Sequence, residues 1–348
     1  MMSWEERLLA TDTRNFHSSV LALIRQQLET WPMLREAITG LYNVEYKKMI
    51  VKGSEVFAQF NPKRIVSTAA KVDTATIKQR PCFLCVENLP AEERGIPFGD
   101  NFIVLCNPFP VLRNHLVLSA RTHTPQTIEG NLRTLLDFAR NFGDGWFTLY
   151  NGPRCGASAP DHLHFQAASN ELLPILRDVD EWPEFLRTND RDVESIDLRN
   201  YRLNALIARS ANCEALIGWF EKELQTVCMM YQTETGSRIS EESSRSQATP
   251  GNNENGWIGW EPVLPSYEEP MVNLVAAFSG TQWTLICYPR SRHRPSCYYA
   301  EGEAKFTVSP AAIDLSGVIV VPNPDHFARI TASVVEQIYA EITLDYDR

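Results

Sequence analysis

Polar and apolar side chains alternate in the segment His-Leu-His-Phe-Gln, and this alternation constrains the fold more than any other feature of the sequence. In a β-strand, successive side chains point to opposite faces. His162, His164 and Gln166 would therefore share one face, while Leu163 and Phe165 share the other. Any one of the histidines could be structural, but three polar groups in strict alternation favour a strand with one face on a core and the other on a site.

The remaining periodicities predict an α+β chain. Apolar residues recur at helical spacing in three segments, and short apolar runs bounded by Gly, Pro or Asn indicate strands in four others. We expect helices over residues 12–30, 127–142 and 213–231, and strands over residues 55–60, 102–105, 115–118 and 146–150.

A faint internal repeat suggests that two copies of one unit make up the chain. Residues 102–108 resemble residues 283–289, and residues 115–123 resemble residues 317–326, with a helix expected after each. Between the two halves, residues 232–256 carry one apolar side chain of any size, a composition that cannot form a packed core. We interpret that segment as a mobile loop.

Composition excludes several classes of protein. A formal net charge of −10 disfavours general binding to nucleic acid, whose phosphates such a chain would repel. No run of apolar residues is long enough to cross a membrane, and the start of the chain lacks the pattern of a secretory signal. We therefore expect a cytoplasmic protein, in which the 8 cysteines are metal ligands or core residues rather than disulfides.

Cys82 and Cys85 form a Cys-x-x-Cys pair, which is typical of metal binding or of redox chemistry. The residues that follow are a poor start for a helix, so metal binding is favoured, provided that two more ligands exist. His123, where a strand gives way to a loop, and His162 complete a set of two sulfur and two nitrogen ligands. Such a set favours tetrahedral zinc, and a closed set predicts a structural ion rather than a catalytic one.

The segment between the strand at 146–150 and the histidines has the composition of a phosphate-binding loop. Gly152 and Gly156 permit close approach of the backbone, and amide groups could cradle a phosphate together with Asn151, Arg154 and Ser158. Any turn at the end of a strand could look similar. Its position directly before the histidines favours the site.

An anionic substrate would need a local cluster of positive charge in this acidic chain. Candidates lie in two tracts, whose members are Lys63, Arg64, Lys71 and Arg80, and Arg290, Arg292, His293 and Arg294. Arg64 and Arg290 are the members that we expect to bind substrate, with Arg290 reaching over the site as a phosphate or acceptor clamp. A solvated surface is the alternative for each residue.

Together these motifs resemble the galactose-1-phosphate uridylyltransferase branch of the histidine-triad superfamily, well over residues 55–170 and more loosely over residues 270–330. The resemblance implies a histidine-triad-like α+β fold of two related antiparallel half-barrel units with packed helices. We expect an N-terminal catalytic unit with the zinc site over residues 1–175, a helical connection over residues 176–265 and a C-terminal unit over residues 266–348. The resemblance leaves a homodimer open.

The same resemblance implies the roles of the site residues. Cys82, Cys85, His123 and His162 would bind zinc, His164 would be the nucleophile, and Gln166 would bind the phosphoryl group of a covalent intermediate. A zinc-bound imidazole has already donated its lone pair, which also favours His164 over His162 as the nucleophile. Glutamine in place of a third histidine resembles the transferases rather than the hydrolases of the superfamily.

The resemblance implies that the substrate is a nucleotide or nucleotide sugar and that the acceptor is phosphate or a phosphorylated compound. The loop before the histidines is similar to that of diadenosine tetraphosphate phosphorylases (ATP adenylyltransferases), whereas His-Leu-His-Phe-Gln-Ala is similar to GDP-hexose phosphorylases. Asp161, inserted before the first histidine, departs from the former pattern. A nucleotide hydrolase and a non-catalytic zinc-containing scaffold that binds a nucleotide are the alternatives.

Overall fold

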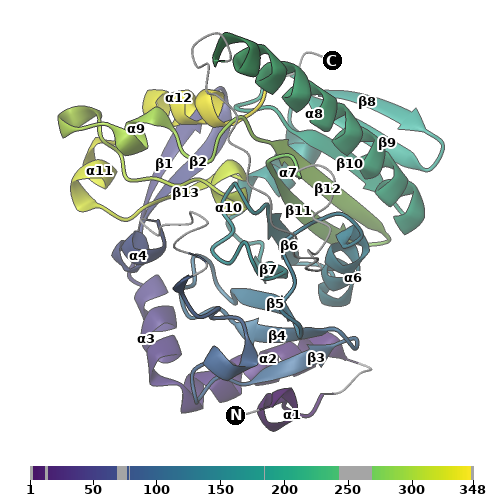
Figure 1. Cartoon of the computed structure of the whole chain (residues 1–348), viewed down its shortest axis with the longest axis vertical. Coiled ribbons are helices and arrows are strands. Elements are labelled where there is room, and N and C mark those ends of the chain that lie inside the picture. Colours follow the sequence, from purple (N-terminus) through teal and green to yellow (C-terminus); the bar gives the residue numbers. More distant parts are fainter. Residues whose placement is uncertain are drawn as a thin grey trace, which may run out of the picture.

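The computed structural model describes residues 3–11, 15–68, 77, 79–183, 185–242 and 269–345 (Figure 1). The predicted basic residue Lys71 lies outside the described residues. The helices are α1 (Trp4–Arg7), α2 (Phe16–Thr30), α3 (Pro32–Leu41), η1 (Pro62–Arg64), α4 (Ile65–Thr68), η2 (Val86–Asn88), α6 (Leu132–Phe142), α7 (Pro174–Glu181), α8 (Cys213–Glu242), α9 (Ser296–Tyr299), η3 (Gly302–Ala304), α10 (Ala312–Leu315), α11 (Pro324–Arg329) and α12 (Ala332–Ile342). The strands are β1 (Glu45–Val51), β2 (Ser54–Phe60), β3 (Gly95–Phe98), β4 (Phe102–Cys106), β5 (Leu116–Ala120), β6 (Trp146–Asn151), β7 (His164–Ser169), β8 (Phe185–Asp190), β9 (Val193–Leu198), β10 (Leu206–Ser210), β11 (Val272–Ser279), β12 (Gln282–Pro289) and β13 (Val318–Val321).

Two sheets organise the described residues. The large sheet has ten strands in the order β3-β4-β5-β7-β6-β11-β12-β10-β9-β8, and every neighbouring pair in it is antiparallel. The small sheet has the order β1-β2-β13, with β13 parallel to β2. The predicted α+β class is confirmed, and the antiparallel strands expected in two half-barrel units are joined in one sheet.

The large sheet is a duplication about the pair β6 and β11. On one side the chain runs β3, β4, β5, α6, β6, β7, and on the other it runs β8, β9, β10, α8, β11, β12, with the same strand order outward from the centre. The counterpart of β4 is therefore β9 rather than β12, and β13 belongs to the small sheet. The residue matches taken as the internal repeat therefore paired strands that are not counterparts. They arose because short apolar runs recur in every buried strand.

The outer strands β8, β9 and β10 lie within the predicted helical connection, residues 176–265. The second half of the sheet thus draws on both predicted C-terminal segments, and the proposed boundaries at residues 175 and 265 stay a prediction. Helix α8 continues to Glu242, so residues 232–242 are helical rather than loop. Once a helix is nucleated, polar residues such as Gln, Glu and Arg extend it readily. Residues 243–256 of the predicted loop lie outside the described part of the chain.

Each face of the large sheet is covered, so that central strands are buried on both sides. Tyr150 and Leu274 pair across the centre and pack into a core that includes α2, α6 and α8. Leu149 and Val275, the next pair, face the opposite core, which includes the small sheet, α7, α10 and α12 (Figure 1). The alternation of these partners follows from the two-residue repeat of a strand.

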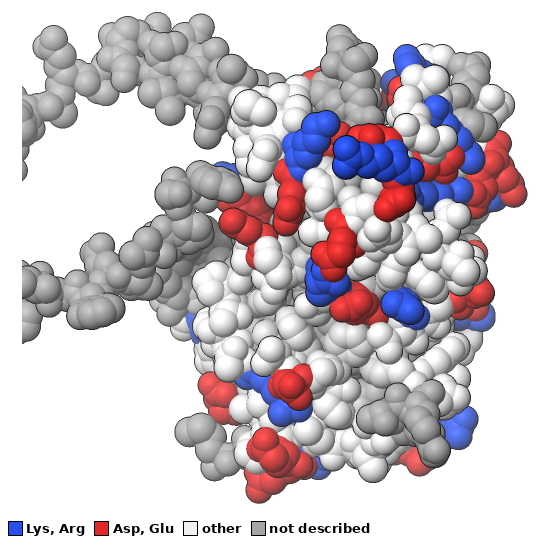
Figure 2. All heavy atoms as spheres, turned by 90° about the vertical axis from the view of Figure 1, so that its right-hand side faces the viewer, with Lys and Arg blue, Asp and Glu red and all other residues white. Residues whose placement is uncertain are grey.

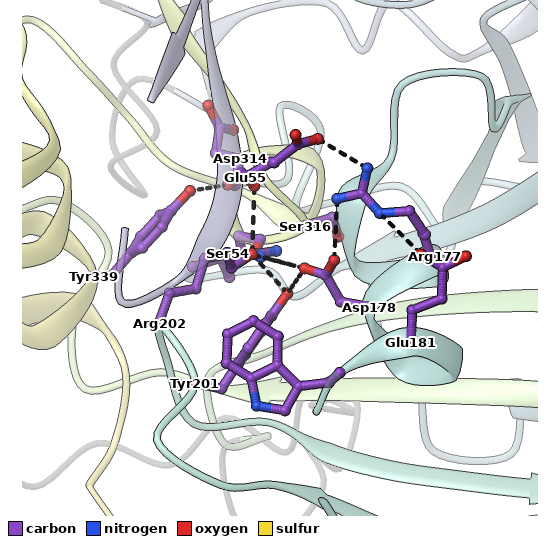
Figure 3. A network of polar contacts seen from close by, with 12 residues as sticks. Ser54, Glu55, Arg177, Asp178, Glu181, Tyr201, Arg202, Asp314, Ser316 and Tyr339 are labelled. Carbon is purple, nitrogen blue, oxygen red and sulfur yellow. Dashed lines mark hydrogen bonds and ion pairs between the residues drawn. The ribbon is translucent and has the colours of Figure 1, made fainter. Parts of the chain in front are cut away.

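A buried polar network joins the small sheet to the large one (Figure 3). The Asp178 carboxylate on α7 accepts hydrogen bonds from Tyr201 Oη at 2.6 Å, Ser54 Oγ at 2.7 Å and Arg202 Nη1 at 3.0 Å. The Arg202 side chain is fully buried and also donates to Leu315 O at 3.4 Å, in α10. The network therefore fixes α10, which lines the cavity described below.

Surface charge is mixed rather than segregated on the face in Figure 2, where Lys and Arg lie beside Asp and Glu. Ion pairs between described residues include Arg187 with Glu194 and Arg209 with Asp180. No helix in the described part of the chain is long and apolar enough to cross a bilayer.

Candidate active site

A cavity of about 470 Å³ opens where β7 begins, and His164 lies in its wall. The residues of the sequence analysis that line it are Arg64, Arg80, Asn151, Gly156, Ser158, His164, Gln166, His293 and Arg294. The strand register places Gln166 opposite Val117 of β5 and Val117 opposite Leu105 of β4, and all three side chains line the cavity. Its floor therefore crosses three neighbouring strands.

His164 is held in one orientation by its own strand. Its Nδ1 lies 2.8 Å from His162 O, and because a carbonyl only accepts, Nδ1 carries the proton. The lone pair of Nε2 is then available. Burial lowers the pKa of His164 to about 4, so the imidazole is neutral at pH 7. A neutral ring whose other nitrogen is oriented by a carbonyl has the chemistry that a histidine nucleophile needs.

Gln126 fixes the backbone around His164, a role that the sequence analysis missed. Its Oε1 accepts from His164 N at 2.8 Å, and its Nε2 donates to His164 O and to Asn151 O, both at 3.0 Å. One buried amide thus clamps the start of β7 to the end of β6. No local pattern marks Gln126, because its partners are brought to it by the fold.

The amide of Gln166 is oriented by His115. The Val111 N–H donates to His115 Nδ1 at 3.1 Å, so the ring carries its proton on Nε2. That nitrogen lies 2.7 Å from Gln166 Oε1 and donates to it. The Asn107 amide nitrogen lies 3.5 Å from His115 Nε2, too far to replace Gln166 as the partner of that nitrogen. The NH₂ group of Gln166 is therefore left to donate elsewhere, toward the cavity that the residue lines.

A second chain of hydrogen bonds orients Asn151. Arg290, which has donors only, gives Nη1 to Asn273 Oδ1 at 2.6 Å. Asn273 must then present its NH₂ group to Asn151 Oδ1, at 2.8 Å, and Ala312 N donates to the same oxygen at 3.0 Å. The NH₂ group of Asn151 is left over, as it is in Gln166. Two amides beside His164 are thus held with their donors available to an anion.

Arg290 itself is not at the surface of the site. Its side chain is fully buried, is absent from the lining of the cavity, and donates to Pro310 O and Ile342 O as well as to Asn273. Of the predicted tract, His293 and Arg294 line the cavity instead. Arg290 acts on the site through Asn273 and Asn151, without reaching over it.

The loop residues divide in the same way. Ser158 lines the cavity and its carbonyl accepts from Arg80 Nη2 at 2.6 Å. Arg154 points away and donates to Glu269 O at 2.8 Å. A Cβ on Gly152 would come within 2.8 Å of Val272 O, so this glycine is needed for packing rather than for contact with a ligand.

The four predicted metal ligands come together beside His164. Their ligand atoms all lie within 4.8 Å of one another. His162 Nδ1 is 3.4 Å from Cys82 Sγ and 3.6 Å from Cys85 Sγ, and His123 Nδ1 is 3.2 Å from Cys85 Sγ. His162 Nε2 donates to Ala120 O at 2.9 Å, which leaves Nδ1 to bind an ion. The donor set and its spacing fit a tetrahedral ion, so this cluster could hold a metal.

The cavity is lined by two carboxylates that the sequence analysis did not single out, Glu93 and Asp314. The Asp314 carboxylate accepts from Ala311 N at 2.9 Å and from Val320 N at 2.8 Å, whereas Glu93 lies among mainly apolar side chains. Glu93, two residues before β3, lines the cavity and is only 4% exposed. Its neighbours in the lining are Leu89, Pro90, Leu105 and Cys106. Sequence alone gives no signal for it, since a glutamate in a polar loop is usually on the surface.

The described residues thus combine two related antiparallel units in one sheet with a His-x-His-x-Gln segment beside a Cys₂His₂ cluster. This arrangement agrees with the histidine-triad-like α+β fold that the resemblance predicts.

The comparisons with known proteins support this fold. Residues 23–169 match the family described as a domain of unknown function, DUF4922. The yeast Ap4A phosphorylase Apa2 has the same fold, with a TM-score of 0.53 and 14% identity over 89% of this chain and 96% of that one. Its complex with Ap4A gives 0.52 and 14% over 92% and 97%, and its complex with AMP gives 0.50 and 13% over 92% and 96%. No curated protein sequence matches the chain.

Proposed function

We propose that the protein is a nucleotidyltransferase of the phosphorylase type. It transfers a nucleoside monophosphate from a nucleoside diphosphate derivative or polyphosphate to phosphate or a phosphorylated acceptor, through a covalent nucleotidyl-His164 intermediate. The observation that carries the proposal is the arrangement around one neutral imidazole. His164 presents Nε2, while His115 and Asn273 hold the Gln166 and Asn151 amides with donors left for phosphoryl oxygens.

The reaction proceeds in two displacements. His164 Nε2 attacks the α-phosphorus, a P–N bond forms, and the P–O bond to the leaving phosphate or sugar phosphate breaks. An oxygen of the acceptor phosphate then attacks the same phosphorus, and the P–N bond breaks to return neutral His164. In both steps negative charge spreads over the phosphoryl oxygens. Donors already oriented by other side chains stabilise that charge without reorganising, which lowers both barriers.

Positive groups supply the remaining affinity for the phosphates. Arg64, Arg80 and Arg294 line the cavity, so three positive charges lie where a polyphosphate would bind in a chain whose net charge is −10. Burial and the neighbouring arginines lower the pKa of His293, which also lines the cavity, to about 4, so this side chain is neutral at pH 7. Asn151, Arg64 and Ser158 are the substrate-binding residues of the sequence analysis that this geometry supports best.

Zinc is the ion that we propose for the cluster of Cys82, Cys85, His123 and His162. Bound there, it would supply a rigid anchor for His162, whose carbonyl orients the nucleophile. With all four positions taken by protein ligands, the ion would not contact the substrate.

The experiment is to incubate the protein with nucleotides labelled at the α-phosphate and to look for label on the protein. A transferase forms a labelled enzyme, and added phosphate discharges it as a nucleoside diphosphate. A hydrolase releases only the monophosphate, whether or not phosphate is present. A scaffold that only binds nucleotide takes up no covalent label.

A further inference from the structure

The floor of the cavity leads from the reactive histidine to a buried carboxylate. Gln166 on β7, Val117 on β5 and Leu105 on β4 lie in one row across the sheet, and Leu105 is paired with Gly95 of β3. Neighbouring strands are about 4.8 Å apart, so the row from β7 to β4 is roughly 10 Å long. Glu93 lies two residues before Gly95, at the β3 end of this row.

The backbone at Glu93 is firmly held. Glu93 O accepts from Arg7 Nη1 at 3.1 Å and from Arg94 Nη1 at 3.0 Å, and Arg7 also donates to Leu89 O at 3.0 Å. Glu93 N donates to Pro90 O at 3.1 Å. The guanidinium of Arg7 is thus committed to backbone carbonyls rather than to the carboxylate.

The carboxylate has no hydrogen-bond partner among the described residues, although Glu93 is only 4% exposed. Burial raises the pKa of Glu93 to about 8, and the charge of Arg7 only partly opposes this effect. A buried carboxylate without donors is costly, and protein interiors rarely retain one unless a ligand satisfies it. In the free protein the carboxyl group is therefore mostly protonated near pH 7. A ligand that brings two donors into the cavity would stabilise the ionised form, in which both oxygens are acceptors.

The walls next to Glu93 suit a flat, apolar group. Leu84, Leu89, Pro90, Leu105 and Val117 line this part of the cavity. Apolar side chains of this kind can pack against both faces of a nucleobase, while the edge of the base contacts the Glu93 carboxyl group.

We propose that Glu93 binds the Watson–Crick edge of a guanine base, and so makes the protein specific for guanine nucleotides. This inference rests on the proposed function, since it places the α-phosphate at His164. Guanine carries two adjacent donors, N1–H and the N2 amino group, which match the two oxygens of one carboxylate. The other bases place at least one acceptor against the carboxylate: N1 in adenine, N3 in cytosine and both carbonyls in uracil.

Substitution of Glu93 by glutamine tests the inference by reversing the pattern. A glutamine amide offers one acceptor and one donor, which match N6 and N1 of adenine and mismatch guanine. We expect the wild-type protein to bind GMP at least tenfold more tightly than AMP, and Glu93→Gln to reduce that ratio by about a hundredfold, equivalent to two such contacts. Glu92→Gln, which changes the exposed neighbouring carboxylate, should leave the ratio unchanged.

The measurement is calorimetric titration of each protein with GMP and with AMP, followed by covalent labelling with GTP and ATP labelled at the α-phosphate. A wild-type protein that binds AMP as tightly as GMP, or a Glu93→Gln protein with an unchanged ratio, overturns the inference alone. Tight GMP binding without a covalent label overturns the proposed function and leaves base recognition intact. A folded protein that binds neither nucleotide overturns both.

Discussion

Glu93 should make the stability of the free protein depend on pH in an unusual direction. Its pKa is 4.5 in the unfolded reference and about 8 in the folded chain. Below pH 4.5 the Glu93 carboxyl is protonated in both the unfolded and the folded state, and its contribution to the free energy of unfolding is at its maximum. As pH rises, the unfolded chain loses the proton first, so each pH unit removes about 1.4 kcal/mol of the free energy of unfolding. By pH 8 the loss approaches about 4 to 5 kcal/mol, a large part of the stability of a typical domain.

Glu93→Gln removes this proton and should flatten the curve. Two other titratable groups lie near the carboxylate: Arg7, which stays charged, and Cys106, whose thiol pKa is raised by burial so that it stays neutral. The assay is urea unfolding between about pH 5 and about pH 8, with Glu92→Gln as the matched control. The free energy of unfolding of Glu93→Gln should rise steadily relative to that of the wild type as pH increases. If the free energy of unfolding changes with pH in the same way in all three proteins, Glu93 does not titrate as described.

Three further predictions follow from the rest of the site and from the core. Cys82→Ser should lose bound zinc, measured by metal analysis, and lower the melting temperature, whereas Cys213→Ser should do neither. His115→Phe should slow covalent labelling by about tenfold to a hundredfold at unchanged zinc content, because Gln166 loses its orientation, and His115→Gln, which can still donate, should restore part of the rate. Asp178→Asn should cost about 3–5 kcal/mol in urea unfolding, because the fully buried guanidinium beside it loses its counter-charge; a loss below about 1 kcal/mol would contradict that account.

Local patterns predicted the strand that carries His164 and Gln166, and the four residues that come together beside it. The alternation that places His162, His164 and Gln166 on one face is set by the strand itself, and β7 confirms it from His164 onward. The four cluster residues come from separate segments of the chain. Their side chains, two thiols and two imidazoles, are typical zinc ligands, and this allowed the set to be predicted before their positions were known.

Residues whose role depends on tertiary burial could not be predicted. Arg290 appeared to be an exposed clamp, because nothing in its tract reveals that its acceptors come from β11, the segment before α10 and the end of α12. Glu93 looked like a surface residue until α1 placed Arg7 against its loop. His115 orients Gln166 and Gln126 holds the backbone of His164 by hydrogen bonds. The partners in these hydrogen bonds are distant in the sequence, so no local pattern indicated either role.

The position of the covalent nucleotide distinguishes His164 from the other histidines as the nucleophile. Protein treated with a nucleotide labelled at the α-phosphate is digested under mildly alkaline conditions, which preserve a phosphoramidate, and the labelled peptide is mapped by mass spectrometry. The account predicts label on His164, which has the free Nε2, and none on His162, whose ring is committed to the metal cluster and to Ala120 O. His164→Ala should abolish the label while zinc content and melting temperature stay unchanged. Label on His162, on His123 or on no histidine would contradict the mechanism.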